Sequence, residues 1–139
     1  MIQNQYSIFE SELTVRPDDI DMFNHVHNSK YLDYVLAARY EQMEAFYGMS
    51  MEKFMNLGFG WVVSSVNIDF KRPLSLGDTF TVETGIESIH KKGCRITFKI
   101  TNLKNKKTSS DGWFDFIMID LKTGKSAFVS DDVITLYSI

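Results

Sequence analysis

Residues 30–47 read KYLDYVLAARYEQMEAFY, and this stretch decides the fold. It contains no Gly or Pro, follows Asn28 and Ser29 as candidate N-caps and is closed by Gly48, so it predicts a long helix. A narrow polar stripe is formed by Asp33, Ala37, Glu41 and Glu44. Apolar side chains occupy much of the remaining circumference, namely Leu32, Val35, Leu36, Met43 and Phe46. A helix with so little polar surface needs to be enclosed by other elements.

Most of the remaining chain alternates with period two, which is typical of strands. One strand is expected over residues 6–16, and four or five more after Gly60. The first of these is expected to carry on one face Val62, Val66, Ile68 and Phe70. The last two are expected over residues 113–121 and 127–137, the latter with a bulge or bend at Ser130-Asp131-Asp132.

A second, short helix is expected from Met51 to about Leu57, with Ser50 as its N-cap and Gly58 as its stop. A strand, a nearly all-round apolar helix and then a run of antiparallel strands together predict an α+β fold in which a sheet wraps the helix. The length of 139 residues is that of one globular domain, so residues 1–139 are read as a single domain.

The composition narrows the function classes. The net charge of −3 includes no run of like charge long enough for a nucleic-acid or membrane-surface arm. The N-terminus does not resemble a secretory signal, and no apolar run approaches the ~20 residues that span a bilayer. We therefore expect a cytoplasmic protein with no nucleic-acid partner and no membrane insertion. Dinucleotide, Walker, G-x-S-x-G and paired C-x-x-C motifs are missing from the sequence, so no nucleotide, serine-hydrolase or zinc-finger site is predicted.

Cys94 is the only cysteine, which excludes an internal disulfide and fits a reducing compartment. It shares a face with Ile96, Phe98 and Ile100 in an alternating stretch. A buried core residue is the favoured interpretation, and a nucleophile would need neighbours that sequence alone does not reveal.

Polar chemistry concentrates in one loop, residues 18–28, which reads DDIDMFNHVHN and leads into the long helix. Unpaired N–H groups and the dipole at a helix N-terminus favour developing negative charge, so an oxyanion could be held there. A carboxylate beside it in an apolar groove could act as a general base or attack a thioester directly, with a pKa raised by desolvation. Asp21 fits this role better than Asp18, Asp19 or Asn28, for which turn and capping chemistry is an equal explanation.

A metal site is the alternative for the same loop, because Asp19, Asp21, His25 and His27 are all of ligand type. No standard ligand spacing such as H-E-x-x-H is present, which makes this alternative the weaker one. We predict no metal.

Residues 15–32 also resemble a known family, the hotdog-fold acyl-CoA thioesterases of the 4-hydroxybenzoyl-CoA thioesterase type. They look like its D-x-D, G-H-V-x-N and Y-L signature, with Asn24 at the position of the Gly, and the likeness extends to acyl-ACP thioesterases. In the second half, residues 66–74, 76–78 and 121–125 are similar too.

The resemblance implies a hotdog fold, in which five or six antiparallel strands wrap the helix, and a homodimer joined edge to edge, with a tetramer as the alternative. It implies that Asp21 is the catalytic carboxylate, as general base or nucleophile. It places the oxyanion donor on the backbone around His25 and Val26. Asn28 and Tyr31 match positions near the acyl-thioester groove. No cofactor is implied other than the coenzyme A of the substrate.

Basic groups for the coenzyme A phosphates are proposed by residue type alone: Lys71, Arg72, Lys91 and Lys92, with the first two preferred. Four aromatic residues are candidates for an acyl pocket, although core packing is favoured for most of them: Phe54, Phe59, Trp61 and Phe70.

Three positions depart from the family pattern. Asn24 replaces the usual Gly, Leu36 replaces a Glu that many members carry, and His27 replaces an Asn. Asn tolerates a positive φ less readily than Gly. Three functions therefore stay open: an acyl-CoA thioesterase as the first choice, an acyl-ACP thioesterase, and a dehydratase-like or non-catalytic protein that binds acyl thioesters.

Overall fold

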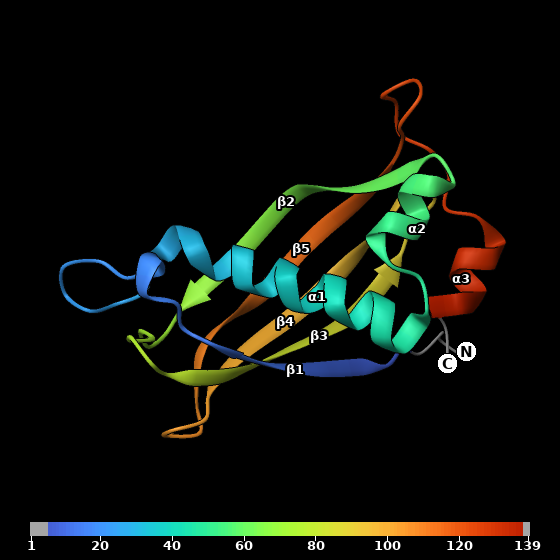
Figure 1. Ribbon diagram of the computed structural model, residues 1–139. Helices are drawn as coiled ribbons and strands as arrows, with labels where there is room; N and C mark the ends of the chain where they lie inside the picture. Colours follow the sequence, from blue (N-terminus) through green and yellow to red (C-terminus); the bar gives the residue numbers. More distant parts are fainter. Residues whose placement is uncertain (1–5, 138–139) are drawn as a thin grey trace.

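A computed structural model describes residues 6–137 and shows a long helix lying against one five-stranded antiparallel sheet (Figure 1). The strands are β1 (Ile8–Thr14), β2 (Phe59–Phe70), β3 (Thr79–Ile89), β4 (Gly93–Asn102) and β5 (Lys107–Asp120). The helices are α1 (Tyr31–Tyr47), α2 (Met51–Asn56) and α3 (Asp131–Tyr137), with short 3-10 turns η1 (Pro17–Asp19) and η2 (Asn28–Lys30).

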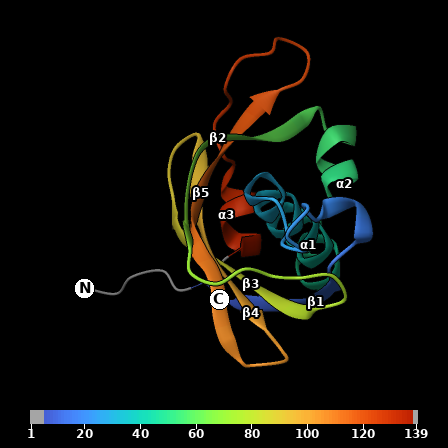
Figure 2. The ribbon, with the colours of Figure 1, turned by 90° about the vertical axis from the view of Figure 1, so that its left-hand side faces the viewer.

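The sheet has the strand order β1-β3-β4-β5-β2 and curls around α1, as the end-on view shows (Figure 2). The α+β hotdog fold predicted from the sequence is therefore confirmed. Burial of the apolar helix against the inner face of the sheet supplies the main driving force. Val35 and Ala38 of α1 are fully buried, as are Phe80, Ile96 and Phe114 of the three central strands.

The polar stripe of α1 faces solvent as predicted, but the opposite face is less apolar than expected. Arg39 and Gln42 are buried there, although long polar side chains are seldom fully enclosed. Arg39 Nη1 donates to Thr84 Oγ1 at 3.1 Å, and Gln42 Nε2 donates to Val82 O at 3.2 Å. These bonds tie the helix to β3. Phe46, in contrast, is 53% exposed and stacks on Phe9.

The start of α1 differs from the prediction. The chain enters the helix through η2, and no side chain caps either element within the described residues. Asn28 and Ser29 are therefore not N-caps, because they already belong to the helical turn. Gly48 closes α1 with φ 64°, and Ser50 Oγ caps α2 by accepting from Lys53 N, both as expected.

A β-bulge in β2 corrects the predicted face of that strand. Pairing with β5 shifts register between Val63 and Ser65. Val63 lies opposite buried Phe116 and Val66 opposite buried Phe114, so both face the helix. Val62 lies on the outer face, because the extra residue reverses the alternation. The prediction that Val62 shares a face with Val66 was wrong.

The C-terminal region was also predicted wrongly. Residues 131–137 form α3 instead of a strand, with Val133 N donating to Ser130 Oγ at 3.3 Å. The acidic pair Asp131-Asp132 falls in its first turn, where it suits the helix dipole. β5 begins at Lys107 rather than Trp113.

Cys94 is buried as expected, and burial raises the pKa of its thiol to about 12.

None of the helices within residues 6–137 has the length and apolar character needed to cross a bilayer.

Candidate active site

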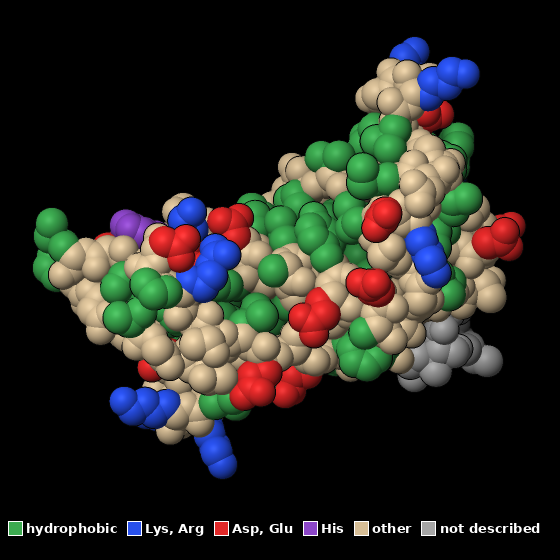
Figure 3. Space-filling view, viewed as in Figure 1, with side chains coloured by type: hydrophobic (Ala, Val, Ile, Leu, Met, Phe, Trp, Pro, Cys, Tyr) green, Lys and Arg blue, Asp and Glu red, His purple; other side chains and the backbone are tan. Residues whose placement is uncertain are grey.

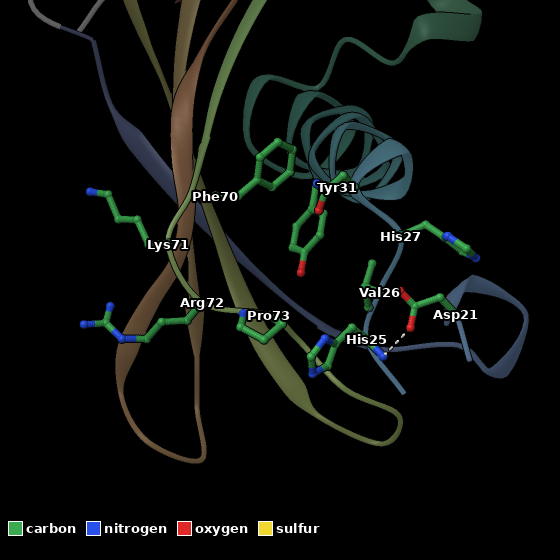
Figure 4. A pocket seen from close by; sticks show the side chains of 10 residues that line it. Asp21, His25, Val26, His27, Tyr31, Phe70, Lys71, Arg72 and Pro73 are labelled. Carbon is green, nitrogen blue, oxygen red and sulfur yellow. Dashed lines mark hydrogen bonds between the residues drawn. The ribbon is translucent and has the colours of Figure 1, made fainter. Parts of the chain in front are cut away.

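A cavity of about 520 Å³ opens beside the N-terminal end of α1 (Figure 4). Its lining comes from three segments: the loop before α1, the first turn of α1 and the end of β2. The lining residues are Asp21, His25, Val26, His27, Asn28, Tyr31, Phe70, Lys71, Arg72 and Pro73. The structure thus brings together at one cavity all seven predicted site residues: Asp21, His25, Val26, Asn28, Tyr31, Lys71 and Arg72.

Hydrogen bonds among residues 21–25 close the turn that follows Asp21. Asp21 N donates to His25 O at 2.8 Å, and Asn24 N donates to Asp21 O at 3.1 Å. Asp21 Oδ1 accepts from Phe23 N at 2.8 Å and from His25 N at 3.1 Å. Asn24 has φ 62°, so the residue that replaces the family's Gly adopts the left-handed conformation the turn requires.

The expected direction of the Asp21 pKa was wrong. The N–H of His25 is the main influence, and together with that of Phe23 it holds the pKa of the Asp21 carboxyl below its ordinary value. Desolvation acts in the opposite direction but is weaker, because the side chain is only half-buried at the edge of the cavity. Asp21 is therefore ionised at neutral pH and able to accept a proton.

The backbone donors around His25 are already used. His25 N donates to Asp21 Oδ1, and Val26 N donates to Leu74 O at 2.8 Å. Neither group is free to bind an oxyanion in this structure. The N–H groups of Asn28 and Ser29, at the start of η2, donate to no acceptor within residues 6–137. Asn28 lines the cavity together with Asp21, so a residue with an unbonded N–H and the ionised Asp21 belong to the same lining.

The loop is also anchored to the segment that follows β2. Val26, which is 3% exposed, bonds through its N–H to Leu74 O of this segment, and His25 forms a β-bridge with Ser75. The phenol oxygen of Tyr31 accepts from Leu74 N at 3.0 Å, and its ring packs edge-on against Phe70. Tyr31 therefore forms a fixed wall of the cavity rather than a mobile polar group.

Lys71 and Arg72 lie at the rim, with their side chains extending away from Asp21 (Figure 4). Lys71 Nζ pairs with Asp111 Oδ2 at 2.7 Å, and Arg72 Nη1 donates to Thr108 O at 3.0 Å. Both are exposed, so a phosphate at the rim competes only with surface interactions, which are weak. Lys91 and Lys92 do not line this cavity.

The three carboxylates of the loop have different environments. Asp18 is exposed, whereas Asp19 is 1% exposed and accepts from Tyr34 Oη at 2.6 Å and from Arg16 Nε at 3.0 Å. Arg16 in particular lowers the pKa of Asp19. Asp19 therefore links the loop to α1 through Tyr34.

No group of three or more His, Cys, Asp or Glu side chains that could hold a metal ion gathers in the described part of the chain.

An apolar surface continues from the cavity along the space between α1 and β2 (Figure 3). Val66 and Phe70 point toward the helix side of the sheet, yet they are 44% and 47% exposed because α1 does not cover them. Leu32 and Leu36 lie on the flank of α1 opposite Tyr34, which packs on β3. Both are half-buried. Phe54 and Trp61, two other candidates for an acyl pocket, are instead buried in the core.

Comparisons with known proteins identify similar proteins. The family model of the Thioesterase-like superfamily matches residues 15–135. The chain is 28% identical over 117 residues to the long-chain acyl-CoA thioesterase FadM of Escherichia coli, which covers 84% of this chain and 87% of that protein. It is 32% identical over 77 residues to the chloroplastic acyl-acyl carrier protein thioesterase ATL3 of Arabidopsis thaliana, which covers 55% of this chain and 40% of that protein.

A solved structure of similar fold is that of a Staphylococcus aureus protein in complex with CoA. The two chains superpose with a TM-score of 0.83 at 21% identity, covering 98% of this chain and 85% of the other. At this identity the likeness shows the fold.

Proposed function

Because the chain belongs to the thioesterase-like superfamily and is a thioester hydrolase, we propose that it hydrolyses acyl-CoA at the Asp21 cavity. Water cleaves the bond between the acyl carbonyl carbon and sulfur, and the products are a carboxylic acid and the free thiol of coenzyme A. The observation that carries the proposal is that two residues line one cavity: Asp21, whose carboxylate is ionised, and Asn28, whose N–H has no acceptor within residues 6–137.

Asp21 acts as general base or as nucleophile. As a base it takes a proton from water as the water attacks the carbonyl carbon. As a nucleophile it forms an acyl-aspartyl anhydride, which water then hydrolyses. In both cases the tetrahedral oxyanion lies against the N–H of Asn28, at the positive end of the helix dipole. The leaving thiolate is stable enough to need little acid assistance.

The proposed acyl site is the apolar surface between α1 and β2, which begins at the cavity. Leu36, at the position where many relatives carry Glu, keeps this surface apolar along α1. An aliphatic chain is therefore the expected acyl group, in line with the long-chain acyl-CoA named for the Escherichia coli relative. Lys71 and Arg72 at the rim are the proposed partners of the coenzyme A phosphates.

A homodimer through β2 is part of this proposal. Within residues 6–137, β2 pairs only with β5, so its other edge has twelve residues without a partner strand. An exposed edge of this length is normally covered. Pairing of two β2 strands would cover it and would also shield Val66 and Phe70.

The test is thiol release from acyl-CoAs of short, medium and long aliphatic chains and from an aromatic acyl-CoA. Faster turnover of the longer aliphatic substrates supports the proposed site, and a Leu36→Glu variant should lose that preference. Equal turnover of all acyl groups would contradict the assignment of the acyl site. No turnover of any acyl-CoA would contradict the function itself.

An acyl-ACP thioesterase is the second candidate, favoured by the similarity to the chloroplastic enzyme. The same acyl group presented on coenzyme A and on a carrier protein separates the two. A dehydratase-like or purely binding protein would bind acyl-CoA without releasing thiol.

A further inference from the structure

The loop before α1 carries two large apolar side chains that face solvent. Met22 is 90% exposed and Phe23 is 73% exposed, although they directly follow Asp21. This loop is the outermost part of the molecule at its end of the long axis, and the space-filling view shows apolar side chains there (Figures 1 and 3). Large apolar side chains exposed together at a tip indicate a contact surface.

The tip is held in a fixed shape. Bonds between Asp21 and His25 close the loop, and Asn24 Oδ1 accepts from Leu76 N at 3.2 Å. Leu76, 48% exposed, therefore lies beside the loop and extends its apolar surface. A surface that is already ordered loses little conformational entropy when it binds.

Positive charge gathers at the same end of the molecule. Three segments form its loops: residues 15–30, residues 71–78 beside them, and residues 103–107, which project from the same end beyond residues 71–78 (Figures 1 and 2). They carry seven Lys or Arg and four Asp, whereas the rest of the chain carries eight Lys or Arg and 14 Asp or Glu. Lys104, Lys106 and Lys107 are all exposed at the turn between β4 and β5. These loops therefore carry a net charge of +3 on a chain whose net charge is −3, although one of their cations, Lys71, is paired with Asp111 just outside them.

We propose that this end of the protein docks reversibly on an anionic lipid surface, with Met22, Phe23 and Leu76 entering the interface. Exposed apolar side chains at an end whose other loops carry Lys and Arg match an interface of acyl chains beneath negative headgroups. An acidic protein would also attract the cations, but it would not require two almost fully exposed apolar side chains at a protruding tip. The attachment is weak, because so few side chains enter the bilayer.

Co-sedimentation of the full chain with vesicles tests the proposal without any need for turnover. One set of vesicles contains phosphatidylcholine alone, and the other contains phosphatidylcholine mixed with phosphatidylglycerol. The tip variant is Met22→Ser/Phe23→Ser. Its matched control is Met55→Ser/Leu57→Ser, which removes side chains of similar exposure (56% and 65%) from the opposite end of the molecule.

The wild type and the control variant are expected to bind the mixed vesicles, and the tip variant to bind them roughly tenfold less well. Lys104→Gln/Lys107→Gln should weaken binding to the mixed vesicles only. Added salt should weaken binding of the wild type to these vesicles in the same way, because it screens the charges. This charge variant keeps the test decisive if the tip variant does not fold. Equal binding by the wild type to both vesicle types, or equal losses in the tip and control variants, would overturn the proposal.

Two other results would assign the surface to a different partner. If the tip variant alone changes the oligomeric state in size-exclusion chromatography, the surface joins copies of this chain. If the wild type binds an acidic carrier protein through the tip but ignores vesicles, the partner is that protein. Either result would overturn docking on lipid.

Discussion

The carboxylate of Asp21 accepts the backbone N–H of His25 at 3.1 Å, four residues further along the chain. This bond fixes Asp21 at the edge of the cavity, favours its ionised form and at the same time occupies the N–H of His25. The N–H of His25, which was expected to bind an oxyanion, thus holds the Asp21 carboxylate in place. The free donor lies three residues later, at Asn28.

The pH dependence of turnover should report the lowered pKa of Asp21. A carboxyl whose pKa lies below its ordinary 3.8 stays ionised as the pH falls, so kcat/KM should not lose activity to protonation of Asp21 until below that value. The measurement is kcat/KM against pH, with circular dichroism showing that the fold persists. An acidic limb that moves when Asp21 is replaced by Glu, but is centred above about pH 5, would contradict this assignment.

Replacement of Asn28 by Pro should remove the oxyanion donor while the helix is kept. Proline is tolerated in the first turn of a helix, and His27 before it has φ −57° and ψ 137°, which suit a residue preceding proline. We expect kcat to fall by about 10²- to 10³-fold. Asn28→Ala, which keeps the N–H, should leave kcat within a few-fold of wild type. Similar losses in both variants would show that the side chain, and not the N–H, matters.

Loss of the Tyr34 hydroxyl should destabilise the protein. Tyr34→Phe leaves buried Asp19 with one partner fewer, so the free energy of unfolding should fall by about 1–3 kcal/mol. Urea denaturation measures the change, and the control is Tyr40→Phe, because the Tyr40 hydroxyl makes no hydrogen bond within residues 6–137. Because the pKa of Asp19 is lowered in the folded state, the free energy of unfolding should also depend on pH. The contribution of ionised Asp19 to stability is present above pH 3.8 and is lost as the pH falls through the folded-state pKa.

Buried Arg39 should depend on Thr84. Thr84→Val removes a hydroxyl that accepts from the guanidinium and also donates to Gln42 Oε1. No carboxylate within residues 6–137 pairs with Arg39. We expect this variant to lose about 2–3 kcal/mol of stability, because the cation is left buried and poorly bonded. With Arg39→Met in the background, Thr84→Val should cost less. Strictly additive losses in this double-mutant cycle would contradict a direct interaction.

The β-bulge predicts that substitutions at two neighbouring valines differ in their cost to stability. Val63→Thr places a hydroxyl on the helix side of β2, opposite buried Phe116, and should cost about 1–2 kcal/mol. Val62→Thr faces outward and should change stability by less than about 0.5 kcal/mol. Thermal unfolding of the two variants makes the comparison. The reverse order would show that the strand keeps a regular alternation.

The sequence predicted those features that depend on long apolar patterns. The enclosed helix α1 and the strands of the sheet follow from periodicity, and Gly48 and Ser50 mark helix ends by their own conformational preferences. The predictions from sequence failed where a single residue changes the face of a strand or the type of element. The bulge near Ser64 reverses a face, and Ser130-Asp131-Asp132 starts a helix in a stretch that alternates like a strand.

The candidate site was predicted as a set of residues but not as a set of bonds. Asp21, Asn28 and Tyr31 line one cavity, as the loop motif indicated. Which N–H groups are free depends on contacts with Leu74, which is distant in sequence. The positive end of the molecule was missed for a similar reason, because its cations come from three separate loops and form no run of charge.

The most direct test of the proposed chemistry compares Asp21→Asn with Asp18→Asn, a change to an exposed carboxylate of the same loop. Single-turnover hydrolysis of a long-chain acyl-CoA gives the chemical rate, and calorimetry with the matching acyl-CoA thioether, which cannot be hydrolysed, gives the affinity. We predict that Asp21→Asn lowers the rate by at least about 10²-fold and binds the thioether as the wild type does, whereas Asp18→Asn changes neither. Hydrolysis by Asp21→Asn within a few-fold of the wild-type rate would contradict a catalytic role for this carboxylate.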